Sequence, residues 1–302
     1  MKEEKIKTRM KTLLFVGVFF FSILPFFANK PQEIKGEELI FKNAFANGEE
    51  KTFQSKNNPF GWDKISAYTT YFNQNEGGRC ENIAIAASLI DGIIIQPYGE
   101  FSFNQTVGKR TEEAGFHQAK IIVNGEYVNG VGGGVCQVST TLYNAALKAG
   151  LTVTEFHPHS LRVGYVAPSR DAMVSTYSDL RFFNPHPFSV CLSAQVLQGS
   201  VKITFYGKNQ GLRYELCSEI LEEIQPPPAI VKEGDEEGVL RAPMSGLRSE
   251  MYVECYRGER LMYRKRLRRD EYRPIQGIIV KKIVNVTNKM LSNDCVFSKK
   301  ML

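Results

Sequence analysis

The chain has 302 residues, a formal net charge of +6 and 43% hydrophobic residues, so a disordered chain is excluded and a folded core is expected. Much of the positive excess lies at the N-terminal tip and in residues 257–282. It is too diffuse for a nucleic-acid-binding surface and suits a protein beside an anionic membrane or wall polymer. The six cysteines, from Cys80 to Cys295, include no CxxC pair, which excludes a zinc ribbon and a dense disulfide scaffold.

The N-terminus has the pattern of an export segment. Residues 1–11 are rich in basic side chains, and residues 12–28 are apolar and uncharged. This pattern predicts a cytoplasmic tail followed by a transmembrane signal anchor or a signal peptide. Phe26 stands where a cleavage site needs a small residue, which favours the uncleaved anchor. Residues 29–58 are polar and predict a linker, so we expect the rest of the chain outside the cytoplasm.

The folded part begins near Trp62 and alternates short helical and strand patterns. Residues 82–91 predict a short helix, and Asn124-Gly125 predicts a hairpin between strands at residues 119–123 and 126–128. A second helix is expected from Cys136 to Gly150, with an apolar face and a terminal glycine. Further strands are expected at residues 93–95, 101–103, 151–156, 161–166, 173–177, 180–183, 188–196 and 201–206.

A run of three prolines, Pro226-Pro227-Pro228, predicts a boundary before a smaller C-terminal part. Strands are expected there at residues 251–256, 261–265 and 277–286. The expected fold class is therefore α+β, with a mixed or antiparallel sheet packed on a central helix that opens with a cysteine, followed by a small all-β module. The predicted domains are residues 59–212 and 213–287, followed by a tail at 288–302.

The stretch from Gly132 to Leu147 carries the strongest chemical signal. Three consecutive glycines give a backbone that can take positive φ and let another group approach closely. Cys136 follows them at the start of the predicted helix, where unpaired N–H groups and the helix dipole favour a thiolate. The plain alternative is a small buried cysteine behind a tight turn.

Histidines and aspartates that complement this cysteine follow the helix. His157 and His159 are two apart, so on an extended segment they would point to the same side. With Asp171 or Asp179 they supply a base and an orienting carboxylate for a thiol nucleophile. The alternatives are a zinc site made of Cys136, both histidines and an aspartate, or histidines without a chemical role. Guanidinium groups bind carboxylates bidentately, which makes two nearby arginines, Arg170 and Arg181, candidate substrate clamps.

These residues resemble the VanW domain. The resemblance rests on three segments, Gly132 to Tyr143, His157 to Ser160 and Asp179 to Phe182, and on a few further residues. These are Tyr165, Arg170-Asp171-Ala172, Asn184, Gly99 to Asn104 and Asn124-Gly125-Glu126. The resemblance to the VanW domain covers roughly residues 60–210. Residues 215–285 faintly resemble the small glycine-marked β module that often follows such domains. The family is named for a protein of glycopeptide-resistance clusters in Gram-positive bacteria.

The chain departs from the family pattern at four places. Phe156 replaces an arginine, Ser169 replaces the glycine before Arg-Asp-Ala, Met173 replaces a threonine, and Pro97 to Glu100 is stretched by one residue. None of these changes removes Cys136, His159 or Asp179.

The resemblance implies a cell-envelope protein that acts on peptidoglycan stem peptides or their precursors. Cys136 would be the nucleophile of an L,D-transpeptidase-like acyl transfer, and His159, or less favoured His157, the base. Asp179 or Asp171 would orient that base. The candidate substrate-binding residues are Gly133, Gly134, Gln137, Ser139, Thr140, Tyr165, Arg170 and Arg181.

We expect backbone N–H groups of residues 134–137 to form an oxyanion hole. No cofactor, metal or nucleic acid is expected, and the N-terminal segment would contact the cytoplasmic membrane. The alternative function is a non-catalytic peptidoglycan-binding or scaffold protein.

Overall fold

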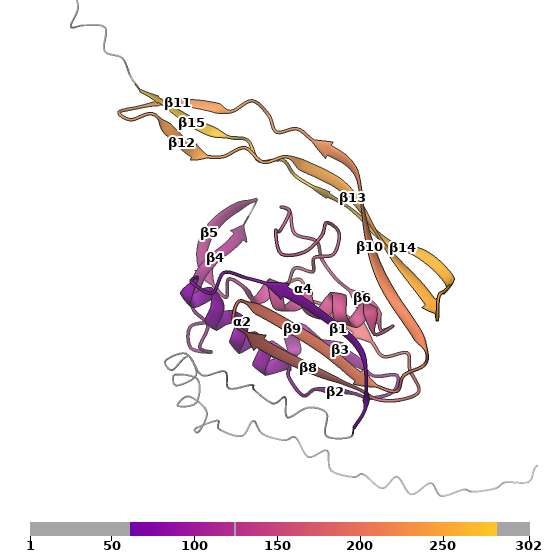
Figure 1. The fold of residues 1–302 in the computed structure, drawn as a ribbon. Helices are drawn as coiled ribbons and strands as arrows, with labels where there is room; N and C mark the ends of the chain where they lie inside the picture. Colours follow the sequence, from indigo (N-terminus) through magenta and orange to yellow (C-terminus); the bar gives the residue numbers. More distant parts are fainter. Residues whose placement is uncertain (1–60, 124, 283–302) are drawn as a thin grey trace, which may run out of the picture. The chain divides into compact units, whose positions relative to one another are not determined.

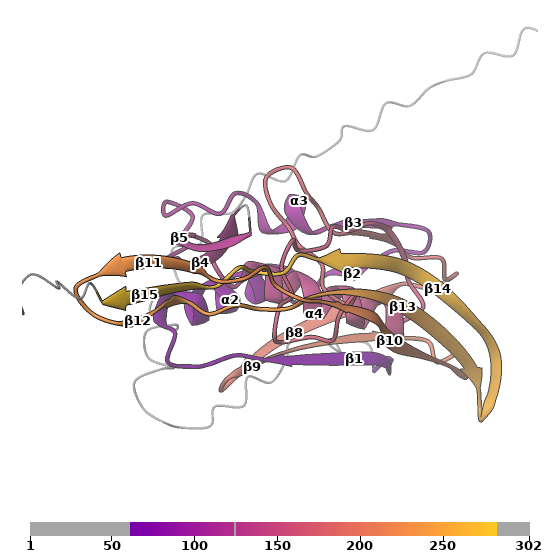
Figure 2. The same cartoon turned by 90° about the horizontal axis from the view of Figure 1, so that it is seen from above.

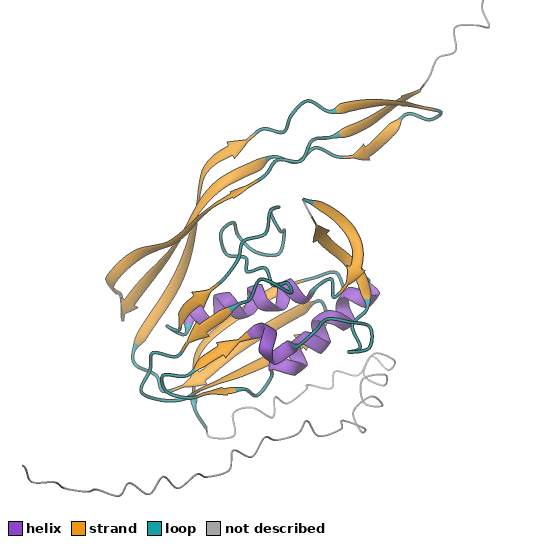
Figure 3. Cartoon of the chain, turned by 180° about the vertical axis from the view of Figure 1, so that it is seen from behind, coloured by secondary structure: helices purple, strands orange, loops and turns teal. Residues whose placement is uncertain are grey.

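The computed structural model describes residues 61–123 and 125–282, so the predicted tail, anchor and linker at residues 1–58 and the end at 288–302 lie outside the described residues. The helices within the described part are α2 (Gly77–Ile90), α3 (Phe103–Val107) and α4 (Val135–Lys148). None of them is long and apolar enough to cross a membrane. Strands dominate (Figure 3), and almost all pairs are antiparallel, which confirms the α+β class.

Between residues 61 and 282, the described strands form five sheets (Figure 1). The first is β1-β9-β8-β2, from Asp63–Tyr71, Ser200–Gly207, Val190–Leu197 and Ile94–Ile95. The second is β3-β7-β6, from Glu100–Ser102, Arg181–Phe183 and Thr152–Glu155. The predicted hairpin is present as β4 (Gln118–Val123) and β5 (Glu126–Val131). The remaining two sheets are β10-β13-β14 (Leu212–Ile224, Gly246–Arg257, Arg260–Tyr272) and β11-β15-β12 (Ile230–Gly234, Ile278–Lys282, Gly238–Arg241).

The core lies between the first sheet and the helices α2 and α4. In β9, Val201, Ile203 and Phe205 alternate toward the core and are fully buried. Helix α4 contacts β1 and β9, and its Val138 and Leu142 are fully buried. Burial of such side chains is worth about 1.5–3 kcal/mol each.

Helix α4 is buried along most of its length. It begins after Gly134, whose φ is +106°, and is followed by Gly150 with a φ of +73°. The prediction that the helix opens with the cysteine is not confirmed as stated, because the first helical residue is Val135 and Cys136 is the second.

Two predicted strands were wrong. Residues 161–166 and 173–177 form loops without ladder partners, although Leu161, Val163 and Val174 are buried. Val174 packs in the main hydrophobic cluster, and a side chain takes up part of the backbone of the second segment. Nδ2 of Asn104 donates to the carbonyl of Ser175 at 3.0 Å. Apolar content predicted their burial correctly, but it did not imply a sheet.

The proline run lies between β10 and β11, so it connects two sheets instead of preceding the module (Figure 2). The unpredicted strand β10 begins at Leu212, and its many exposed charged residues hid its pattern. Leu216 of β10 and Met251 of β13 belong to the same hydrophobic cluster as α4. All the described residues belong to one compact unit. The boundaries of the two domains within it stay a prediction.

Candidate functional site

The glycine turn before α4 is shaped by neighbouring backbone. A Cβ on Gly133 would lie 2.5 Å from the carbonyl oxygen of Lys120 in β4, and one on Gly134 would lie 2.9 Å from that of Arg79 in α2. Asn82 is fully buried and stabilises the turn by donating a hydrogen bond to the Gly133 carbonyl at 2.9 Å. The groups that approach these glycines closely are therefore backbone carbonyls of the same chain, those of Lys120 and Arg79.

Cys136 is half-buried in the first turn of α4. Its Sγ donates a hydrogen bond to the carbonyl oxygen of Val174 at 3.4 Å. Burial alone would raise the pKa of Cys136, but the hydrogen bond and charge of His159, with help from Arg110, bring that pKa below its usual value. The site therefore stabilises the thiolate of Cys136 more than water stabilises that of an ordinary cysteine.

His159 is buried and held by one carboxylate. Its Nδ1 and its backbone nitrogen both lie 2.7 Å from Oδ2 of Asp171. Burial alone would lower the pKa of His159, but the interactions with Asp171 and Cys136 raise it to about 9. Because Asp171 holds Nδ1, Nε2 is the ring nitrogen left for the thiol.

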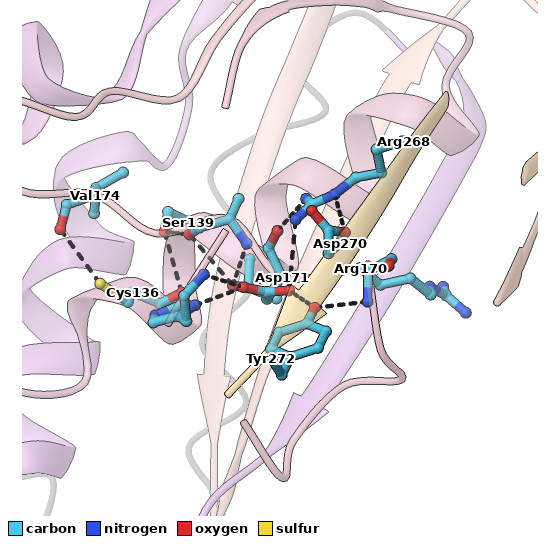
Figure 4. Close-up of polar contacts among 12 residues, drawn as sticks. Cys136, Ser139, Arg170, Asp171, Val174, Arg268, Asp270 and Tyr272 are labelled. Carbon is cyan, nitrogen blue, oxygen red and sulfur yellow. Dashed lines mark hydrogen bonds and ion pairs between the residues drawn. The ribbon is translucent and has the colours of Figure 1, made fainter. Parts of the chain in front are cut away.

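Asp171 is contacted by two side chains of strand β14, Tyr272 and Arg268, as Figure 4 shows. Its Oδ1 accepts a hydrogen bond from the hydroxyl of Tyr272 and lies 3.8 Å from Nη2 of Arg268. Arg268 also donates to the Asp171 carbonyl at 2.7 Å. Burial alone would raise the pKa of Asp171, but His159, Arg268 and Tyr272 lower it, which keeps the carboxylate charged.

The structure separates the other predicted members from this group. His157 is partly exposed and its Nε2 lies 3.0 Å from Glu155, because residues 156–159 are not a regular strand and do not alternate as expected. Asp179 contacts Ser102 and the backbone nitrogen of Asn104 at the start of α3. Among the two candidate histidines and two candidate aspartates, His159 and Asp171 are the ones whose side chains contact each other.

The backbone around Cys136 is only partly available as an oxyanion hole. The N–H of Val135 donates to the Gly132 carbonyl at 3.1 Å, and that of Gln137 donates to the Gly134 carbonyl at 2.9 Å. Within the described residues, the N–H of Cys136 has no such acceptor, as expected in a first helical turn. It is therefore the donor best placed to meet an oxyanion.

Four predicted substrate-binding side chains have structural partners. Gln137 contacts Arg79, Thr70 and Tyr71, whereas Ser139 and Thr140 hold the backbone of Ala172. Arg170 donates to Asn144 at 2.8 Å and lies over the ring of Tyr68 at 4.9 Å. Ser139, Thr140 and Arg170 therefore position the loop that carries Asp171, whereas Gln137 links α4 to α2 and β1.

One further predicted residue, Tyr165, and one that the sequence did not single out, Arg110, lie near Cys136, whereas Arg181 contacts Glu100 and Asp179. Tyr165 is half-buried beside Thr140 and Cys136, and burial raises the pKa of its hydroxyl. Arg181 pairs with Glu100 at 3.3 Å on β7. The unforeseen residue is Arg110, whose side chain packs on Gly132 and whose charge favours the thiolate. Its distance in sequence from Cys136 concealed it.

Among the described residues, no group of three or more His, Cys, Asp or Glu side chains is arranged to hold a metal ion. The zinc alternative required His157 beside Cys136, and His157 contacts Glu155 instead.

Known proteins resemble this chain over the part that contains the site. A family model described as VanW like protein matches residues 78–206. The uncharacterized protein YoaR of Bacillus subtilis (strain 168) is 44% identical over 147 residues, which are 48% of this chain and 48% of that protein. The vancomycin B-type resistance protein VanW of Enterococcus faecalis (strain ATCC 700802 / V583) is 28% identical over 98 residues, 30% of this chain and 36% of that protein.

The match therefore spans about half or less of the length of these curated relatives. A solved structure, the crystal structure of HP0197-G5, is 13% identical and covers 23% of this chain and 97% of that chain, with a TM-score of 0.13, which is too low to indicate a shared fold. The family model and both relatives agree on one assignment: residues 78–206 are a VanW-like domain.

Proposed function

We propose that this chain is a cell-envelope enzyme that transfers an acyl group of a peptidoglycan stem peptide through Cys136. The observation that carries the proposal is the series Cys136, His159 and Asp171, in which a carboxylate fixes Nδ1 of the histidine at 2.7 Å and the thiol pKa is lowered. This is the arrangement that activates a cysteine nucleophile. The kinship with a protein named for vancomycin resistance supports an envelope substrate.

The reaction proceeds in two balanced halves. The Cys136 thiolate attacks a peptide carbonyl, forming an S–C bond, and the oxyanion is met by the N–H of Cys136. The C–N bond then breaks, and the His159 imidazolium gives its Nε2 proton to the leaving amine. An acceptor amine attacks the thioester, His159 takes the proton released, and the thiolate is regenerated.

One observation favours the alternative of a non-catalytic peptidoglycan-binding or scaffold protein. The Cys136 thiol donates to the carbonyl of Val174 at 3.4 Å, as a purely structural cysteine would. In that case the site would only stabilise the fold, and a serine would replace the cysteine with little effect.

The test is turnover of purified muropeptides by the full-length chain, followed by chromatography of crosslinked and cleaved products. Cys136→Ser and His159→Ala should each lower the rate by orders of magnitude, up to about a millionfold. The matched controls Cys80→Ser and His157→Ala, which change a thiol and an imidazole outside the site, should retain the rate. Full activity in a folded Cys136→Ser protein would refute the enzyme.

A further inference from the structure

Strand β14 lies outside the VanW-like match, which ends at residue 206, yet two of its side chains contact Asp171. We propose that Tyr272 and Arg268 of β14 are positioning residues that hold Asp171 in the charged form and orientation His159 requires, so that the C-terminal strand completes the site. This inference rests on the proposed function of Cys136.

The direction of the Tyr272 hydrogen bond is fixed by its neighbours. The backbone N–H of Ser169 can only donate, and it lies 2.7 Å from the Tyr272 oxygen, which therefore accepts. The hydroxyl proton is left for Oδ1 of Asp171. The Tyr272 hydroxyl therefore bridges two groups of the same loop, the backbone N–H of Ser169 and the carboxylate of Asp171.

The segment that carries Asp171 is strained and needs this support. Ser169 has a φ of +60°, a left-handed conformation that favours glycine, at the position where the family pattern has glycine. Its hydroxyl lies 2.7 Å from that of Ser249 on β13, so the module stabilises the turn from a second strand. Such a conformation persists only where its surroundings hold it in place.

Arg268 supplies the matching charge. Its side chain is almost fully buried, and its Nε lies 2.7 Å from Asp270 while Nη1 donates to the Asp171 carbonyl. Nη2 has no hydrogen-bond partner within the described residues and lies 3.8 Å from Oδ1 of Asp171. A buried carboxylate with a cation and a hydroxyl beside it remains ionised to lower pH.

The ionisable groups around Asp171 come from three parts of the chain. Helix α4 brings Cys136 and Tyr143, the loop after β6 brings His159 and Tyr165, and β14 brings Arg268 and Tyr272. Of these, only His159, Arg268 and Tyr272 favour the charged form of Asp171 by a direct contact or close charge. Loss of the Tyr272 hydroxyl therefore raises the pH at which Asp171 becomes neutral and stops stabilising the imidazolium.

The test is the pH profile of Cys136 alkylation by iodoacetamide in the full-length chain, with the modified peptide quantified by mass spectrometry. In Tyr272→Phe the acid limb should move up by about one pH unit. The control Tyr263→Phe, on the same strand and largely exposed, should retain the wild-type profile. Arg268→Lys keeps the charge without the planar fork and should shift the limb in the same direction, which provides a second reading if Tyr272→Phe does not fold.

A merely structural role would lower the melting temperature of these variants and leave the profile in place. Superimposed profiles for wild type, Tyr272→Phe and Arg268→Lys would overturn the positioning role while the proposed function stood. An ordinary thiol profile for wild-type Cys136 would overturn the proposed function, and the positioning role with it.

Discussion

Replacing Asp171 by asparagine isolates the charge that the site depends on. Asparagine has nearly the same shape but cannot stabilise the imidazolium of His159, whose pKa of about 9 depends on that carboxylate. Because the imidazolium of His159 is then less favoured, Cys136 loses part of the interaction that outweighs its burial. The pKa of the thiol should therefore rise.

The size of the effect follows from the thiolate fraction. A thiol of ordinary pKa is about 3% ionised at pH 7, so the largest possible loss of thiolate is a factor of roughly 30. The more basic thiolate is intrinsically somewhat more nucleophilic, which reduces the largest net loss to roughly tenfold. Iodoacetamide labelling of Cys136 at pH 7 should therefore be slower in Asp171→Asn, by up to about tenfold.

Asp179→Asn is the matched control, because Asp179 contacts the start of α3 and not His159. It should label at the wild-type rate. Wild-type labelling in a folded Asp171→Asn protein, or slow labelling only in Asp179→Asn, would refute the assignment of Asp171.

Three further predictions concern stability and are measured by urea unfolding. The pKa of His159 is raised from 6.5 to about 9. The stabilisation that this shift gives the folded state is therefore fully present below pH 6.5 and is lost as the pH rises through 9. The difference in unfolding free energy between wild type and His159→Gln should shrink by about 3 kcal/mol between pH 6 and pH 10. Gly133→Ala places a methyl group 2.5 Å from the Lys120 carbonyl and should destabilise by about 3 kcal/mol or more, whereas Gly164→Ala, with nothing within 4 Å, should change stability by less than about 1 kcal/mol. Ser169→Ala and Ser169→Gly both lose the hydroxyl that contacts Ser249, but only glycine relieves the strain of the φ of +60°. Ser169→Ala should therefore be about 1–2 kcal/mol less stable than Ser169→Gly. Equal stabilities of Gly133→Ala and Gly164→Ala, or of the two Ser169 variants, would contradict these assignments.

Local patterns predicted the parts of the site that are close in sequence. The glycines, Cys136 and the start of α4 lie within a few residues of one another, and Asn124-Gly125 specified the hairpin of β4 and β5. Propensity and turn chemistry act over such short ranges, so one sequence is enough to read them.

The choice between the two aspartates could not be read in this way. Asp171 and Asp179 both follow the histidines, and only the packing of β14 distinguishes them. Tyr272 is 101 residues from Asp171, and β14 is so rich in arginine that it resembles an exposed strand. The family's glycine at the position of Ser169 was the one usable signal, since glycine marks a backbone that needs positive φ.

The most direct measurement of the central claim is the intact mass of the protein mixed with a purified stem peptide and quenched in acid. The account predicts a transient thioester adduct equal in mass to the acyl part of the peptide, located on Cys136 by fragmentation and absent from Cys136→Ser. Product formation without any adduct on Cys136, or an adduct that persists in Cys136→Ser, would contradict it.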